Sequence, residues 1–242
     1  MWIVLVIGVI VGVVVLAHTA PAPFVLDAMV GDSAVWHMPR TNPPTVYLTY
    51  DDGPNPATTP DLLDVLARER VTATFFVIDD HVSAETAPIV RRMFEDGHAV
   101  ALHSASRREM LLPPTRLARE LTAAANHIET LAGARPCPVF RPHGGWRSVS
   151  MFAALRQLDY RLVGWGWMLW DVDWLRPRTP ERILARLVPR IGPGDIVVMH
   201  DGDESAPRKP QPQTVEATAR LIPQLRAKGF EFGTICQRIS PR

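Results

Sequence analysis

The sequence predicts an α/β fold in which helices cover a parallel sheet. Short apolar or β-branched runs alternate with segments of helical periodicity, and several of those segments begin with Pro or Thr and end near Gly. No Gly-rich phosphate loop follows the first run, which disfavours nucleotide-binding versions of an open sheet. The expected strands fit either an open doubly wound sheet or a closed β/α barrel.

The elements are expected in strict alternation after residue 44. The strands are predicted at Val46–Tyr50, Thr72–Ile78, Ala99–His103, Val139–Arg141, Arg161–Leu169, Asp195–His200 and Glu231–Ile235. The helices are predicted at approximately Pro60–Arg70, Thr86–Asp96, Pro114–Leu131, Val149–Leu158, Pro180–Ile191 and Thr214–Lys228. Pro suits the first turn of a helix and Gly suits the position after its end, so this punctuation supports the assignment.

The residues before this region are expected to lie outside the folded domain. Met1 to Ala17 contains no charged side chain. Its length falls between a signal-peptide core of about 7–15 residues and a spanning helix of about 20. We expect residues 1–20 to form an apolar transmembrane anchor helix or a signal peptide, with a buried helix or strand as the third alternative. Residues 21–43 are expected to be an irregular linker and residues 44–242 the domain, placed outside the cytoplasm.

The overall charge disfavours a nucleic-acid partner. The chain has 242 residues, with 26 Lys and Arg against 25 Asp and Glu, for a formal net charge of +1. A nucleic-acid-binding surface would require an excess of Lys and Arg. The balance therefore indicates a neutral or small polar partner.

The cysteine content leaves two alternatives open. Cys137 and Cys236 are the two cysteines of the chain. An exported protein could pair them, but both could equally be small buried apolar residues. Their spacing does not distinguish a disulfide from two thiols.

Chemically reactive side chains stand at the ends of most predicted strands. In a β/α barrel these ends meet at one rim, where active sites lie. Two adjacent carboxylates are tolerated there if one binds a cation and an Arg keeps the other ionised. Asp and His together also suit Zn²⁺ and similar ions. The residues at the strand ends are Asp51, Asp52, His103, Arg141, Asp171, Asp173, His200 and Asp201.

Five motifs occur in order along the same region: TYDDGP, GHAVALHS, FRPHGG, WDVDW and IVVMHD. Together they resemble the signatures of the polysaccharide deacetylase family, the NodB-type domain of carbohydrate esterase family 4. The resemblance extends from about Pro44 to Cys236. It implies a distorted (β/α)7 barrel, which agrees with the alternation of strands and helices.

The resemblance also implies a role for five of the residues at the strand ends. Asp51 would be the general base, Arg141 would orient it, and His200 would be the general acid. Asp52 and His103 would bind a divalent metal, Zn²⁺ first, with Co²⁺ or Ni²⁺ as alternatives. Such a metal lowers the pKa of water and prepares it for attack on an amide.

The WDVDW motif is irregular. The family usually has two Asp three residues apart before the Trp, whereas Asp171 and Asp173 are separated by one residue. Asp173 with Trp174 is the simplest match, so we assign Asp173 to orient His200 and Trp174 to contact the substrate. A register with Asp171 in that role is also possible.

The second motif departs from the family at one position. The family has a second metal-binding His four residues after the first, where this chain has Arg107. A guanidinium is always protonated and cannot ligate a metal. Either another group completes the site (His143, His81 or Glu109), or the metal is weakly held or absent and Arg107 contacts the substrate, or catalysis is lost. We assign His143 as the third ligand, because it replaces the Pro more usual in the FRPHGG motif.

The resemblance implies a metal-dependent hydrolase that removes N-acetyl or other N-acyl groups from amino sugars. The substrate would be a cell-surface polysaccharide such as peptidoglycan, or a lipid-linked amino sugar. The alternatives are a catalytically silent glycan-binding module and an O-acetyl esterase. We expect a monomer that contacts the membrane only through its N-terminal helix. Asp201, Asp203 and Glu204 are expected to form a solvated loop.

Overall fold

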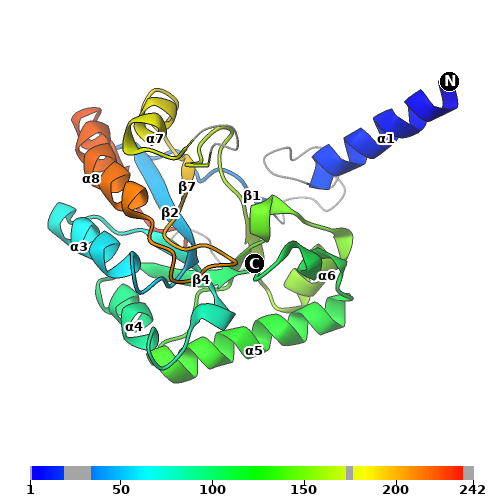
Figure 1. Cartoon of the computed structure of the whole chain (residues 1–242), viewed down its shortest axis with the longest axis horizontal. Helices are drawn as coiled ribbons and strands as arrows, with labels where there is room; N and C mark the ends of the chain where they lie inside the picture. Colours follow the sequence, from blue (N-terminus) through cyan, green and yellow to red (C-terminus); the bar gives the residue numbers. More distant parts are fainter. Residues whose placement is uncertain (1, 19–33, 173–176, 237–242) are drawn as a thin grey trace.

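A curled parallel sheet lies at the centre of the computed structural model, which describes residues 2–18, 34–172 and 177–236 (Figure 1). The strand order is β1-β6-β5-β4-β3-β2-β7, with β8 paired to the start of β2, and every ladder is parallel. The sheet thus forms a half-barrel whose strand ends share one rim. The strands are β1 (Ala34–Val35), β2 (Thr45–Gly53), β3 (Thr74–Ile78), β4 (Ala99–His103), β5 (Val139–Arg141), β6 (Arg161–Val163), β7 (Ile196–His200) and β8 (Glu231–Phe232).

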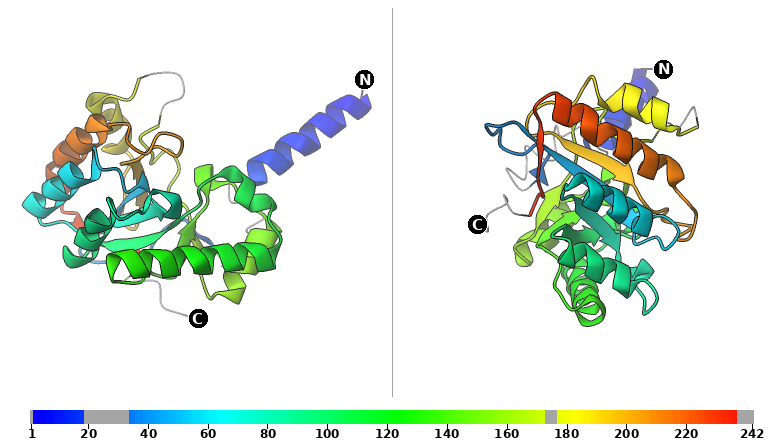
Figure 2. Two further views of the ribbon diagram at one scale, coloured as in Figure 1. Left: turned by 60° about the horizontal axis from the view of Figure 1, so that its bottom comes forward. Right: turned by 90° about the vertical axis from the view of Figure 1, so that its left-hand side faces the viewer.

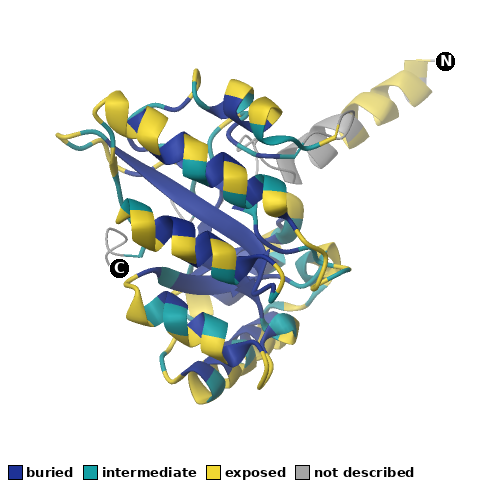
Figure 3. Ribbon diagram, turned by 60° about the vertical axis from the view of Figure 1, so that its left-hand side comes forward, coloured by how far each residue is buried: buried dark blue, intermediate teal, exposed yellow. Residues whose placement is uncertain are grey.

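Helices cover the outer face of the curled sheet, as the two further views show (Figure 2). Most of them have Pro in the first turn, where the missing N–H costs no hydrogen bond. Their sheet-facing sides are buried and their outer sides are exposed (Figure 3). These helices are α3 (Thr59–Glu69), α4 (Ala87–Glu95), α5 (Pro114–Ala132), α6 (Val149–Gln157), α7 (Pro180–Leu187) and α8 (Pro212–Ala227).

The side chains of each strand alternate between two cores. In β3, Phe75 and Val77 pack into the larger core under the helices, whereas Phe76 packs into a smaller core inside the curl. Because the period of a strand is two residues, the same alternation runs through the neighbouring strands. The inward set ends with polar side chains at the rim: Asp51 on β2, His103 on β4, Arg141 on β5 and His200 on β7.

The predicted sheet differs from the structure at one edge. Residues 34–43 were expected to be part of an irregular linker, but Ala34–Val35 pairs with β6, and the backbone N–H of Gly164 donates to Val35 at 2.8 Å. Strand β6 ends at Val163 rather than Leu169, since Gly164 comes so close to Trp36 that a Cβ would lie 2.1 Å from the indole. The strand therefore gives way to a loop whose backbone makes room for the indole.

The N-terminal segment forms helix α1 (Trp2–His18) of 17 residues. Among the described residues, no helix is both long and apolar enough to cross a membrane. The expectation of a transmembrane anchor is therefore not supported.

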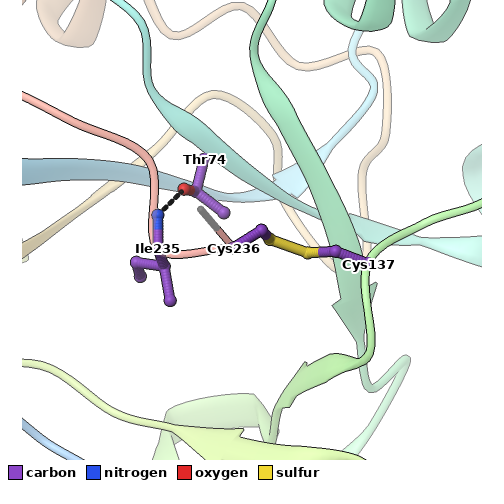
Figure 4. Close-up of a disulfide and its surroundings, with 4 residues drawn as sticks. All are labelled: Thr74, Cys137, Ile235 and Cys236. Atoms are coloured by element: carbon purple, nitrogen blue, oxygen red, sulfur yellow. Dashed lines mark hydrogen bonds between the residues drawn. A yellow bond between two sulfur atoms is a disulfide. The ribbon is translucent and has the colours of Figure 1, made fainter. Parts of the chain in front are cut away.

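A disulfide joins two segments that are far apart in the sequence (Figure 4). Cys137, just before β5, pairs with Cys236, just after β8, across a Cα–Cα distance of 6.1 Å. Next to it, the backbone N–H of Ile235 donates to the Thr74 hydroxyl at 3.0 Å. The disulfide thus holds the C-terminal end of the domain against the strand that carries Arg141.

Replacing both cysteines by Ser is expected to lower the free energy of unfolding by about 2–4 kcal/mol, because the disulfide closes a long loop in the unfolded chain. The sequence separation of the two cysteines is 99 residues. Urea unfolding of the full chain measures the difference. The wild-type protein should lose the same stability on reduction, whereas the double variant should not respond to reductant. Equal stability of the oxidised wild-type and variant proteins would contradict this expectation.

Candidate active site

A cavity of about 440 Å³ opens at the carboxyl ends of the strands. Both acidic and basic side chains line it, together with two indole rings. Most of the residues assigned from the sequence meet here: Asp51, Asp52, His103, Arg107, His143 and His200, with Trp165, Trp170, Arg178, Glu204 and Gln211 from the surrounding loops.

The backbone at Asp52 brings its side chain to the same rim as Asp51. Neighbouring residues of a regular strand point to opposite faces, but the register of β2 against β3 shifts after Asp51, and Asp52 has a φ of 70°. Asp tolerates this left-handed conformation better than most residues. His81 donates from Nδ1 to the Asp52 carbonyl at 2.9 Å, and a Cβ on Gly202 would lie 1.9 Å from the same oxygen. Both carboxylates consequently approach the Nε2 atom of His103.

Arg141 fixes the first carboxylate. It is fully buried, and its Nη1 donates to Asp51 Oδ1 and to the Thr49 hydroxyl, both at 2.7 Å. Its remaining nitrogens donate to the carbonyls of Val163 at 3.3 Å and Gly164 at 2.9 Å. Burial lowers the pKa of Arg141, and the charge of Asp51 opposes this. These hydrogen bonds together fix the guanidinium in one orientation, in which it holds the Asp51 carboxylate in place.

Three ligand-type atoms converge beside this pair. Asp52, His103 and His143 each offer one atom, all within 4.8 Å of one another. Oδ1 of Asp52 lies 3.1 Å from Nε2 of His103 and 3.9 Å from Nδ1 of His143. Ligand atoms held about 2.0–2.1 Å from a tetrahedral Zn²⁺ are separated by about 3.3 Å, which lies between these distances.

The chemistry of these atoms also fits a cation. Nδ1 of His103 donates to the Arg141 carbonyl at 2.7 Å, which leaves the lone pair of Nε2 facing Asp52. Oδ1 of Asp52 and Nδ1 of His143 are buried without a hydrogen-bond partner among the described residues, an arrangement that is costly without a ligand. Burial raises the pKa of Asp52, but when Nε2 of His103 carries a proton in place of a cation, the contact with His103 and the charge of its ring outweigh burial and hold the pKa of Asp52 below its usual range.

The other proposed third ligands are engaged elsewhere. His81 is bonded to the backbone of Asp52. Glu109 accepts from the backbone N–H of Ala105 at 2.7 Å and caps the short helix η2 (Arg107–Leu111). The half-exposed guanidinium of Arg107 lies 3.9 Å from Glu204. Of the three candidate ligands, His143 is therefore the one whose ligand-type atom lies with the carboxylate of Asp52 and the ring of His103.

Asp171 contacts His200 through both of its carboxylate oxygens. Oδ1 of Asp171 lies 2.7 Å from Nδ1 of His200, and its Oδ2 accepts the backbone N–H of His200 at 3.0 Å. Arg178 donates to the same Oδ2 at 3.2 Å. Asp173 and Trp174 lie outside the described residues. The assignment of Asp173 to orient His200 therefore stays a prediction. The alternative register, with Asp171 beside His200, agrees with the contact found, and Asp171 follows a bridge between Trp170 and β7.

Asp171 also sets the protonation of His200. Burial lowers the pKa of His200, but the charge of Asp171 and its bond to the ring outweigh burial and raise the pKa to about 9. Burial would raise the pKa of Asp171, and the charge of His200 instead lowers it. His200 is therefore protonated at neutral pH, as a proton donor must be.

Asp171→Asn is expected to lower the pKa of His200, because burial is then opposed only by the charges of Asp52 and Asp51 and no longer by that of Asp171. Titration of the His200 ring by NMR in chelator-treated protein measures the change. Asp173→Asn is the matched control and should leave the pKa unchanged. A shift in the control and none in Asp171→Asn would reverse the assignment.

The loop after β7 is less solvated than expected. Asp201 is buried, accepts a hydrogen bond from Thr59, and has its pKa raised to about 7 by burial. Glu204 lies at the cavity, with Oε2 2.6 Å from Nε2 of His143. Sequence reasoning missed both, since acidic residues after a strand resemble an exposed turn. The one available signal for Asp201 was its position next to His200.

The sequence and the fold of this chain are similar to those of known deacetylases and esterases. The family model described as polysaccharide deacetylase matches residues 39–163. A chitooligosaccharide deacetylase of Bradyrhizobium sp. (strain ANU 289) is 36% identical over 80% of this chain and 90% of its own length. A solved peptidoglycan N-acetylglucosamine deacetylase, Bc1960, has a TM-score of 0.73 and 25% identity over 87% of this chain and 95% of its own. A family 4 acetyl xylan esterase from Clostridium thermocellum, solved with cobalt, has a TM-score of 0.68 and 32% identity over 80% and 89%.

Proposed function

Since the chain belongs to the polysaccharide deacetylase family, we propose that it hydrolyses the N-acetyl groups of amino sugars in a cell-surface polysaccharide such as peptidoglycan. The observation that carries this proposal is that two hydrogen-bonded pairs of side chains lie at the same rim of the sheet. One is the Asp51–Arg141 pair, and the other is the His200–Asp171 pair. A base and an acid on either side of a bound amide are what this hydrolysis requires. The similar deacetylases and the shared fold support the choice of substrate.

Asp51 and His200 divide the proton transfers. Asp51, held by Arg141, takes the proton of the water that attacks the acetyl carbonyl. His200, protonated and oriented by Asp171, gives a proton to the departing amine. The C–N bond then breaks, and acetate and the free amino sugar are released. Without the second transfer the amine would leave as a strongly basic anion.

Asp52, His103 and His143 would hold a divalent cation, for which Zn²⁺ is the first choice and Co²⁺ or Ni²⁺ the alternatives. A cation there would lower the pKa of water and stabilise negative charge on the carbonyl oxygen. The cobalt in the similar acetyl xylan esterase supports a divalent ion in this fold. Arg107 does not supply a ligand, so the site would depend on His143.

Acetate release from N-acetylglucosamine oligomers, measured with and without chelator, tests the proposed reaction. We expect release that stops after chelation and returns with added Zn²⁺ or Co²⁺. Acetylated xylan is the control substrate, and faster release from it would favour the O-esterase alternative. No release and no bound metal would instead favour a silent glycan-binding module.

We also propose that the domain acts outside the cytoplasm. The disulfide between Cys137 and Cys236 supports this location, because such bonds persist in oxidising compartments. A cell-surface polysaccharide is accessible there. Fractionation of the source cells, with detection of the full-length protein in each fraction, tests this proposal. Recovery of the protein only from the cytoplasm would contradict it.

A further inference from the structure

The second ring nitrogen of His143 faces a carboxylate from another part of the chain. Oε2 of Glu204, in the loop after β7, lies 2.6 Å from Nε2 of His143. We propose that Glu204 is a positioning residue that holds His143 in the tautomer and orientation needed to bind the cation. This inference rests on the metal site proposed above and adds a residue that does not belong to its three ligands.

The distance between the two side chains determines which nitrogen of His143 carries the proton. A carboxylate oxygen and an unprotonated ring nitrogen at 2.6 Å would bring two lone pairs against each other, so we assign the hydrogen to Nε2. The lone pair of the neutral ring then lies on Nδ1, which is the atom that faces Asp52 at 3.9 Å. A carboxylate behind a ligating His fixes the ring and raises its basicity.

His103 has the equivalent arrangement with a different acceptor. Its Nδ1 donates to the Arg141 carbonyl, so its Nε2 faces the site. His143 presents the opposite nitrogen, and Glu204 takes the place of the backbone acceptor. The two imidazoles, with ring centroids 5.6 Å apart, thus direct one lone pair each toward Asp52.

Glu204 also explains how an Arg is tolerated beside a cation site. Nη1 of Arg107 lies 3.9 Å from Oε1 of Glu204, the oxygen not used by His143. The guanidinium lies alongside Gly144, where a Cβ would be 3.5 Å from its Nε. Among the described residues, Glu204 is therefore the carboxylate that pairs with the Arg107 guanidinium. Because both groups are partly exposed, solvent screens their attraction, and the contribution is mainly geometric.

Calorimetric titration of the full-length, chelator-treated protein with Zn²⁺ tests the role of Glu204. Glu204→Ala is expected to weaken Zn²⁺ binding by about 10–100-fold, the usual effect of removing the partner of a ligating His. Glu204→Gln should lose less, since its amide oxygen still accepts from Nε2–H. Asp203→Asn is the matched control, because Asp203 precedes Glu204 but pairs with Lys209 at 2.9 Å. It should bind Zn²⁺ as the wild-type protein does.

The ¹⁵N signals of the His143 ring give a readout that a merely structural role would not change. The wild-type protein should show the Nε2–H tautomer, and Glu204→Ala should show an increased fraction of Nδ1–H with an unchanged unfolding midpoint. Wild-type affinity in Glu204→Ala, together with loss of binding in His143→Ala, would overturn this inference and leave the metal site intact. Absence of Zn²⁺ binding by the wild-type protein would overturn both.

Discussion

His143→Ala is expected to weaken Zn²⁺ binding by more than about 100-fold and to reduce deacetylation in proportion. The loss of an outer partner of a ligand already costs about 10–100-fold, and removal of the ligand itself must cost more. Only Asp52 and His103 of the three converging residues would remain. Calorimetry with Zn²⁺ and acetate release on the same samples measure both effects.

A double variant tests whether the loss expected in His143→Ala is the loss of a metal ligand. Arg107 occupies the position where the family has its second metal-binding His, so His143→Ala with Arg107→His returns a ligand at the family's usual position. We expect the double variant to recover measurable Zn²⁺ binding and acetate release that His143→Ala lacks. Wild-type affinity in His143→Ala alone would contradict the third ligand assigned here.

Asp51→Asn is expected to reduce deacetylation by about 10²–10⁴-fold while Zn²⁺ binding remains, because it removes the proton acceptor and no metal ligand. The Asn oxygen can still accept from Arg141, so the buried guanidinium keeps a partner. Rates measured at saturating Zn²⁺ separate this variant from His143→Ala, whose metal binding is lost. Activity of Asp51→Asn within about tenfold of the wild-type rate would remove Asp51 from the role of general base.

The strands that carry the site could be predicted because their pattern is local. The alternating side chains of β4 and β5 and the reactive residues at their ends gave the bounds found in the structure. Asp51 and Arg141 meet as expected, since parallel strands end at one rim. By contrast, β1 (Ala34–Val35) is too short to show a periodicity, and its place beside β6 depends on tertiary contacts alone.

The loops of the site were harder to predict than its strands. Asp171 and Asp173 lie two residues apart in the sequence, and this spacing does not show which of them contacts His200. The contact of Asp171 with His200 depends on the bridge of Trp170 to β7. Glu204 lines the cavity because the loop after β7 brings its carboxylate to His143, a contact between distant parts of the chain. The disulfide could not be predicted for a similar reason. The two cysteines are 99 residues apart, and their spacing does not show whether the fold brings them into contact.

The most direct test of the account is the location of a divalent ion in crystals of the Zn²⁺-loaded protein, found by anomalous scattering at the zinc edge. We predict one ion bound by an oxygen of Asp52, Nε2 of His103 and Nδ1 of His143, with metal–nitrogen distances of about 2.0–2.1 Å. An ion bound without His143, or the absence of any ion beside Asp52 at saturating Zn²⁺, would contradict it.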